Sequence, residues 1–206
     1  MEKTRSPERL VFFTDAVAAI ALTLLVLPLS ELVPELSAEG APAIEVFTHN
    51  QWKIYTFLLS FAVIARLWYA HHQVFEHVQA YNTALVYLNF GWIFTIALLP
   101  FPTQIVGGFQ TSRFAVLFYI GTILVNSLCY TAMVLVIRRS PEVHGDAPPL
   151  DDQGLINSLL TSSAFLVSFI VGAIWPHLGY WALLLVAAAQ WIARWIKPRS
   201  AVANGS

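Results

Sequence analysis

No charged side chain occurs between Gln153 and Ala193, and this apolar run limits the possible folds more than any other feature. A helix needs about 20 mostly apolar residues to cross the hydrocarbon core of a bilayer. The run is too long for one crossing, so it predicts two helices joined by a turn over residues 175–179. A soluble fold of 206 residues could not cover so much apolar surface. Hydrophobic residues make up 57% of the chain and charged ones only 11%, against about 25% charged residues in soluble domains.

Four further apolar stretches predict spanning helices, which gives six in all. They run from about Leu10 to Leu29, Trp52 to Gln73, Ala84 to Val106 and Phe114 to Ile137. We expect an all-α integral membrane protein with one six-helix domain over residues 1–200 and a flexible tail or cloning remnant over 201–206.

Two segments between the stretches are expected to be loops. Residues 30–51 are acidic and contain prolines and a glycine, which indicates an exposed loop, and residues 140–152 are polar and rich in proline. The second stretch is less apolar than the others because it carries Arg66, His71 and His72. Five spans, with this helix lying at the membrane surface, are therefore the structural alternative.

Basic residues fall mainly on one side of the six-span arrangement. Loops on the cytoplasmic side of a membrane are enriched in Lys and Arg. Only Lys53 and Arg113 fall on the far side, whereas the side of both chain ends carries Lys3, Arg5, Arg9, Arg138, Arg139, Arg194, Lys197 and Arg199. Both termini are therefore predicted to be cytoplasmic.

Several classes of function find no support in the residues. The formal net charge of -1 gives no overall basic signal for nucleic acid, and the single Cys129 rules out a disulfide framework within the chain. A cluster of three histidines and a glutamate, His71, His72, Glu76 and His77, looks at first like a metal site. His71 and His72 point about 100° apart on a helix, and no H-E-x-x-H pattern occurs. We predict no metal, no cofactor and no enzyme activity, and a histidine that hydrogen-bonds a neighbouring helix.

Asp15 is a charged residue inside the first predicted span, where charge is costly and indicates either pairing or function. One interpretation is an ion pair with Arg9 or Arg66 that fixes helix packing. The other is an ion or proton site. The shallow position of Asp15 favours packing, because a carboxylate near the interface can stay hydrated.

An apolar stripe follows one face of the same helix. Ile20, Thr23, Leu24 and Leu27 have the i, i+3, i+4, i+7 spacing of a single helical face. Such a stripe is usually a lipid-facing or packing surface. Several copies around an axis would instead form rings of branched apolar side chains that can gate a pore by dewetting. The periodicity alone leaves both interpretations open.

The first helix also carries a motif, Arg9-x-x-x-Phe13-Thr14-Asp15, that resembles the Arg-x-x-x-Phe-Ser-Asp signature of the transmembrane protein 175 family. Members of this family are prokaryotic relatives of the lysosomal potassium channel, and Thr14 keeps the hydroxyl of the usual serine. The resemblance covers roughly residues 9–103. It continues in the second and third predicted helices at Ser60, Phe61, Ile64, Trp68, His71, His72, Phe75, Asn89 and the run Leu99-Pro100-Phe101-Pro102-Thr103.

The resemblance implies a function and its residues. Bacterial members look like homotetramers in which the first helix of each subunit lines a potassium-permeable pore, with sodium passing less well, in the plasma (inner) membrane. The family's pore constriction carries over onto Ile20, Leu24 and Leu27, with Thr23 as the polar layer. Its helix-anchoring network carries over onto Arg9, Phe13, Thr14, Asp15, Trp68, His72 and Asn89.

Neither the family pattern nor this chain contains the Thr-Val-Gly-Tyr-Gly filter of ordinary potassium channels. Conduction through apolar rings would require a potassium ion that keeps part of its water. A proton-coupled secondary transporter that uses Asp15 and the histidines is the main alternative. An integral membrane enzyme with a metal and a purely structural membrane protein are two further ones.

Overall fold

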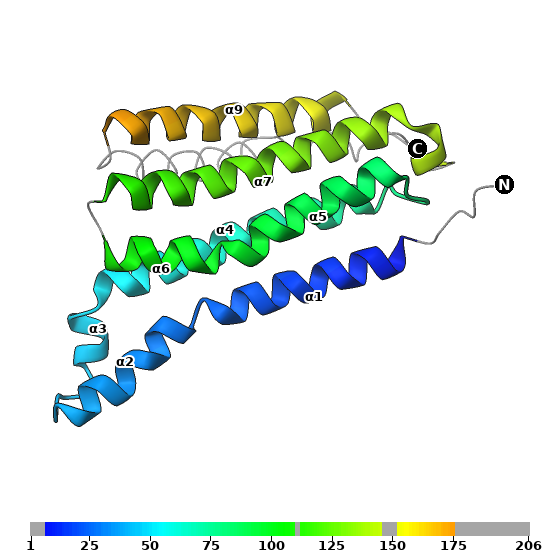
Figure 1. Ribbon diagram of the computed structural model, residues 1–206. Helices are drawn as coiled ribbons and strands as arrows, with labels where there is room; N and C mark the ends of the chain where they lie inside the picture. The colour runs from blue at the N-terminus through cyan, green and yellow to red at the C-terminus, as the bar shows by residue number, and fades with distance from the viewer. Residues whose placement is uncertain (1–6, 110–111, 146–151, 176–206) are drawn as a thin grey trace, which may run out of the picture.

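The computed structural model describes residues 7–109, 112–145 and 152–175, and these residues form helices and short connections. Long helices run side by side in a bundle, with α2 and α3 extending beyond one end (Figure 1). The helices are α1 (Glu8–Leu24), α2 (Leu27–Ala38), α3 (Glu45–Thr48), α4 (Gln51–Phe75), α5 (Thr83–Leu98), α6 (Pro100–Gly108), α7 (Arg113–Arg139), α8 (Pro141–His144) and α9 (Asp152–Ile174).

Five segments of the described chain are long and apolar enough to cross a membrane. They are Glu8–Ala38, Gln51–Phe75, Thr83–Gly108, Arg113–Arg139 and Asp152–Ile174. These five confirm the first five predicted spans and the reading of the chain as an all-helical integral membrane protein. The sixth predicted span, together with the 201–206 tail, lies outside the described residues.

The loop predicted over residues 30–51 is largely wrong, because α2 continues to Ala38 and α3 adds a further turn. Pro28 stands in the first turn of α2, where a backbone N–H would have no partner within the helix. Its missing N–H also explains why α1 stops at Leu24, four residues earlier. Pro34 lies inside α2 and removes only one hydrogen bond.

Gly40 ends α2 with a backbone φ of +68°, a value that glycine adopts readily. The N–H of Gly40 donates to the carbonyl of Ser37, and the N–H of Ala41 donates to that of Leu36. These two bonds form a Schellman motif, which satisfies carbonyls at the end of a helix. The glycine that suggested a loop in the sequence therefore marks the end of a helix.

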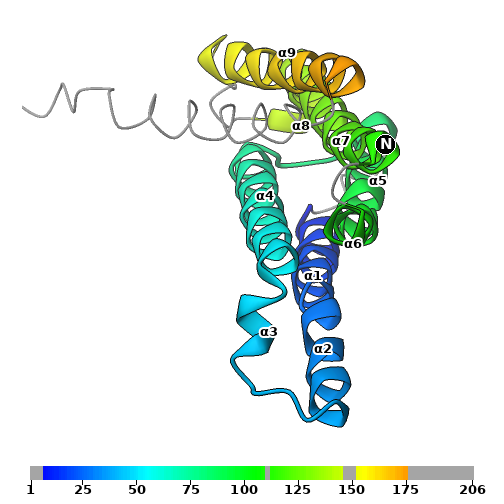
Figure 2. The ribbon, with the colours of Figure 1, turned by 90° about the vertical axis from the view of Figure 1, so that its left-hand side faces the viewer.

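The bundle is built around α7, which packs against α5, α6 and α9, while α1 packs against α4 and α5. Figure 2 shows this arrangement almost end-on, with α1 at one side and α9 at the other. At the contact of α5 with α7, a Cβ on Gly91 would lie 3.2 Å from the Cys129 sulfur. The core is apolar, with fully buried side chains that include Ile64, Leu85, Ile96, Ile120, Ile123, Met133 and Ile137.

Hydroxyl groups form a buried seam between α7 and α9. The Ser162 hydroxyl lies 2.8 Å from that of Ser127 and 2.9 Å from that of Thr131. At the end of the seam Arg138 pairs with Asp152 at 2.5 Å. Apolar side chains gain nothing in lipid by leaving the acyl chains for one another, so such polar contacts are a main source of attraction between spans.

We predict that Ser162→Ala lowers the free energy of unfolding by about 1 kcal/mol, because interhelical hydrogen bonds in membranes contribute about 0.6 kcal/mol on average and up to about 1.7. Unfolding in a denaturing detergent, followed by circular dichroism, measures this loss. Ser163→Ala is the matched control, since Ser163 is the exposed neighbour on the same helix. Equal losses in both variants would contradict the role of the seam.

Candidate functional site

The two faces of α1 differ in what covers them. Its buried side chains, Thr14, Ala18 and Ala21, follow helical spacing and face the bundle. The two alanines are 1% exposed, and such small side chains let neighbouring backbones come close. The Phe13, Ile20 and Leu24 side chains point away from this face and stay exposed.

The residues predicted to form the pore constriction all lie on this uncovered surface. Ile20 is 57% exposed, Leu24 39% and Leu27 47%. Ile20 and Leu24 belong to α1, and Leu27 begins α2, so the proline-dependent break between the two helices falls within the stripe. All three side chains nevertheless stay exposed on both sides of this break, as their spacing predicts.

Thr23 lies on the same exposed surface. Its hydroxyl donates to the Ile20 carbonyl at 2.8 Å, which uses the hydroxyl hydrogen inside the helix. A hydroxyl oxygen has two lone pairs, so Thr23 keeps acceptor capacity toward water or a cation. The Thr23 hydroxyl can therefore only accept further hydrogen bonds, and its neighbours in the stripe are apolar.

On the opposite face, hydrogen bonds attach α1 to α4 and α5. The Trp68 indole of α4 donates to the Asp15 carboxylate at 2.8 Å. The Asn89 amide of α5 donates to the Thr14 hydroxyl at 3.0 Å, and Thr14 itself donates to the Leu10 carbonyl at 2.8 Å. Thr14 and Asn89 are both fully buried. The sequence expectation of an arginine partner for Asp15 gives way to a neutral indole donor.

The second contact of Asn89 is with His71, whose Nε2 lies 2.7 Å from the amide oxygen. That oxygen only accepts, so Nε2 carries the hydrogen. His71 is fully buried and packed between Phe75 and Trp92, with ring centroids 4.2 and 4.3 Å away. Thr14, Asn89 and His71 therefore form one chain of hydrogen bonds from α1 through α5 to α4.

The other residues named from the sequence lie around this chain and have weaker contacts. The His72 ring stacks on Trp68 with centroids 5.5 Å apart, and its Nε2 lies 3.7 Å from the Glu76 carboxylate, with both side chains exposed. Phe13 meets Phe90 edge to face at 6.2 Å, and Arg9 is exposed at the start of α1.

The sequence named His72 for the hydrogen-bonded network, whereas His71 makes the contact with Asn89. Helical spacing contained the signal, because His71 follows Ser60 and Ile64 by 11 and 7 residues and all three are buried on one face of α4. In the described chain no group of three or more His, Cys, Asp or Glu side chains is placed to hold a metal.

Comparison with known proteins finds a family and several relatives to which the chain is similar. The family described as the endosomal/lysosomal potassium channel TMEM175 matches residues 9–100. A potassium channel of Streptomyces collinus is 32% identical over 137 residues, which cover 64% of this chain and 65% of the relative. A potassium channel of Chamaesiphon minutus is 28% identical over 190 residues, covering 86% of this chain and 91% of the relative. Residues 9–100 of the chain are therefore similar to the TMEM175 family.

A solved structure shows the same similarity at the level of fold. The crystal structure of a lysosomal potassium-selective channel TMEM175 homolog from Chamaesiphon minutus superposes with a TM-score of 0.71 and 22% sequence identity, over 93% of this chain and 98% of the other. The match to the zebrafish endosomal/lysosomal proton channel TMEM175 covers 25% of that protein. The chain therefore spans only part of the length of some relatives it matches.

We predict that His71→Phe destabilises the protein more than His72→Phe, by about 1–3 kcal/mol in the free energy of unfolding. Phenylalanine keeps the ring stacking but leaves the buried Asn89 oxygen without a donor. His72 has a side chain that is 43% exposed, so its replacement leaves no buried group unpaired. Detergent unfolding of the two variants measures the difference. A larger loss of unfolding free energy in His72→Phe would assign the structural contact to His72 instead of His71.

Proposed function

We propose that the chain is one subunit of a homotetrameric, potassium-permeable channel whose pore is lined by α1. The observation that carries this proposal is the exposed stripe of Ile20, Leu24 and Leu27 on a helix whose other face is bonded into the subunit. One face of α1 is hydrogen-bonded to its own subunit and the other face is exposed. This arrangement fits a helix that lies between its subunit and a shared axis.

Two further observations support a pore over a surface that merely faces lipid. Relatives of this chain carry the names potassium channel and proton channel. Thr23 also places a hydroxyl oxygen in the stripe, and lipid offers such an oxygen no partner. In a tetramer, Ile20, Leu24 and Leu27 would form the constriction and Thr23 the polar layer.

The chemistry of such a pore differs from that of a carbonyl filter. Rings of branched apolar side chains cannot replace the water around a cation, so the ion passes at least partly hydrated. Potassium gives up water more easily than sodium, which favours potassium through a narrow apolar neck. We therefore propose a modest preference for potassium, with sodium passing less well.

The buried contacts of α1 have a positioning role in this proposal. Thr14 and Asp15 hold α1 through Asn89 and Trp68, with Phe13, Arg9 and His72 at the edge of the set. The distribution of Lys and Arg favours cytoplasmic termini, and the bacterial relatives favour the plasma membrane.

The first test is the reversal potential of the full-length protein reconstituted in a bilayer, with potassium on one side and sodium on the other. We expect a passive current whose reversal potential lies on the side set by potassium. A current that reverses near zero would support a pore but contradict its preference for potassium. Saturable flux coupled to proton movement would favour the alternative, a proton-coupled secondary transporter that uses Asp15.

We predict that Leu24→Ser raises the potassium current or lowers the preference for potassium over sodium, because a polar ring wets the constriction. Leu160→Ser is the matched control, since Leu160 of α9 is 63% exposed and far from the stripe along the chain. Single-channel recording of both variants makes the comparison. Unchanged conductance and selectivity in Ile20→Ser, Leu24→Ser and Leu27→Ser would remove these residues from the pore.

A further inference from the structure

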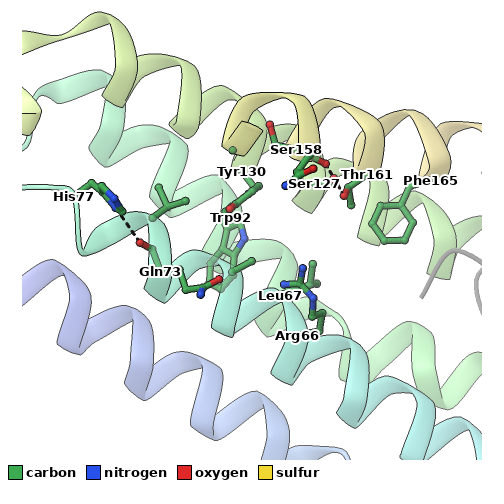
Figure 3. A pocket seen from close by; sticks show the side chains of 14 residues that line it. Arg66, Leu67, Gln73, His77, Trp92, Ser127, Tyr130, Ser158, Thr161 and Phe165 are labelled. Atoms are coloured by element: carbon green, nitrogen blue, oxygen red, sulfur yellow. Dashed lines mark hydrogen bonds between the residues drawn. The ribbon is translucent and has the colours of Figure 1, made fainter. Parts of the chain in front are cut away.

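Two cavities of the described bundle differ in whether their polar side chains are free to bind a ligand. The larger, of about 320 Å³, lies between α4, α5, α7 and α9, and Figure 3 shows Arg66, Tyr130 and Thr161 in its wall. These three residues have interactions of their own within the chain. The smaller cavity, of about 150 Å³, lies between α4, α6 and the junction of α1 with α2. Its polar side chains are less engaged, which makes it the better place for a ligand.

Lys53 of α4 and Gln104 of α6 both line the smaller cavity. In the part of the chain that the structure describes, neither the Lys53 ammonium nor the Gln104 amide makes a hydrogen bond or an ion pair. The ammonium is positively charged, and both groups have hydrogens to donate. The two side chains can therefore donate to the same ligand, and the matching group on that ligand is a negatively charged oxygen.

Contacts between α4 and α6 hold these two side chains on the same cavity. The indole of Trp52, the residue before Lys53, donates to the Val106 carbonyl of α6 at 3.0 Å. The helices are also close at Gly107, where a Cβ would lie 3.2 Å from the Thr56 hydroxyl oxygen. The two donors thus come from different helices whose separation is fixed.

The rest of the cavity wall is largely apolar. Leu25, Pro28, Leu29 and Phe57 contribute hydrocarbon surface, and the hydroxyls of two lining threonines donate to carbonyls of their own helices. A dry cavity of about 150 Å³ accepts a molecule the size of benzene, so this one has room for roughly six carbon atoms of a chain.

The charge of the wall selects the sign of the ligand. The described residues that line the cavity include Lys53 and no aspartate or glutamate. A cationic or zwitterionic group would place its positive charge near the Lys53 ammonium without a carboxylate to balance it. An anionic group is therefore favoured.

The cavity lies at the level of the membrane where lipid head groups are found. Figure 1 shows α6, the start of α4 and α2 at the same end of the bundle. Lys53 lies in the first turn of α4, and the rings of its neighbours Trp52 and Tyr55 stack with centroids 5.2 Å apart. Tryptophan and tyrosine are enriched at membrane interfaces, and lysines near the ends of spans extend toward them. The phosphate groups of lipids are therefore within reach of Lys53.

We propose that the smaller cavity binds an anionic phospholipid. The lipid phosphate accepts hydrogen bonds from the Lys53 ammonium and the Gln104 amide, and one acyl chain enters the cavity beside Phe57. Leu25 is buried on this side of the junction between α1 and α2, whereas the stripe is exposed on the other side. A bound lipid therefore supports the junction from behind the stripe. The site lies within one subunit and does not depend on the proposed pore.

Calorimetric titration of the full-length protein in a neutral detergent tests this site. The probes are phosphatidylglycerol and phosphatidylcholine, both with six-carbon chains, and glycerol 3-phosphate, which has no chains. We expect saturable binding of the phosphatidylglycerol, weaker binding of the phosphatidylcholine and no saturable binding of glycerol 3-phosphate. Lys53→Gln should raise the Kd of the phosphatidylglycerol about tenfold, which corresponds to about 1.4 kcal/mol. Gln104→Leu removes the amide and should also raise this Kd.

Arg113→Gln is the control for charge, because Arg113 is an exposed basic residue at the start of α7 and does not line the cavity. The Kd of this variant should equal that of the unsubstituted protein. If Gln104→Leu does not fold, Lys53→Gln decides the question alone. Equal Kd values for the two phospholipids, an unchanged Kd in Lys53→Gln, or equally tight binding of glycerol 3-phosphate would each overturn the proposal. Loss of channel current in reconstitution would leave this binding unaffected.

Discussion

The arrangement of the subunit depends on Asn89, whose amide joins three helices through two hydrogen bonds. It donates to Thr14 of α1 and accepts from His71 of α4, and all three residues are fully buried. In a bilayer, apolar side chains gain nothing by leaving lipid for one another, so helix association relies on close packing and on polar contacts such as these. The amide has one donor side and one acceptor side, so it fixes both the rotation of α1 and the tautomer of His71. The exposed stripe of α1 is the consequence of that fixed rotation.

Hydropathy predicted the spans well because a bilayer imposes the same length on every crossing, and no tertiary contact can change that requirement. The prediction failed at α2, where Pro34 and Gly40 were taken as signs of a loop. Both have a place in or beside a helix: Pro34 lies inside α2, and Gly40 lies just past its last turn. Composition identifies such residues, but their position relative to a helix end decides what they do.

The exposed stripe of the candidate site could be predicted from the helical spacing of its residues. The hydrogen bonds between helices were harder to predict. The spacing of Ile20, Leu24 and Leu27 requires one face, and the structure leaves that face uncovered. The choice between His71 and His72 depends on the rotation of α4, which a motif of two adjacent histidines does not encode. Likewise, the Trp68 bond to Asp15 needs two helices in register, and the sequence suggested the commoner pairing of unlike charges.

The two faces of α1 offer different groups to their surroundings. The stripe on the exposed face consists of hydrocarbon and the Thr23 oxygen, so a cation there would be neither held nor repelled strongly. The buried face is bonded to the chain of Thr14, Asn89 and His71, in which His71 contacts the Asn89 amide on one side and packs on Trp92 at 4.3 Å on the other. This buried polar chain thus determines which face of α1 stays exposed.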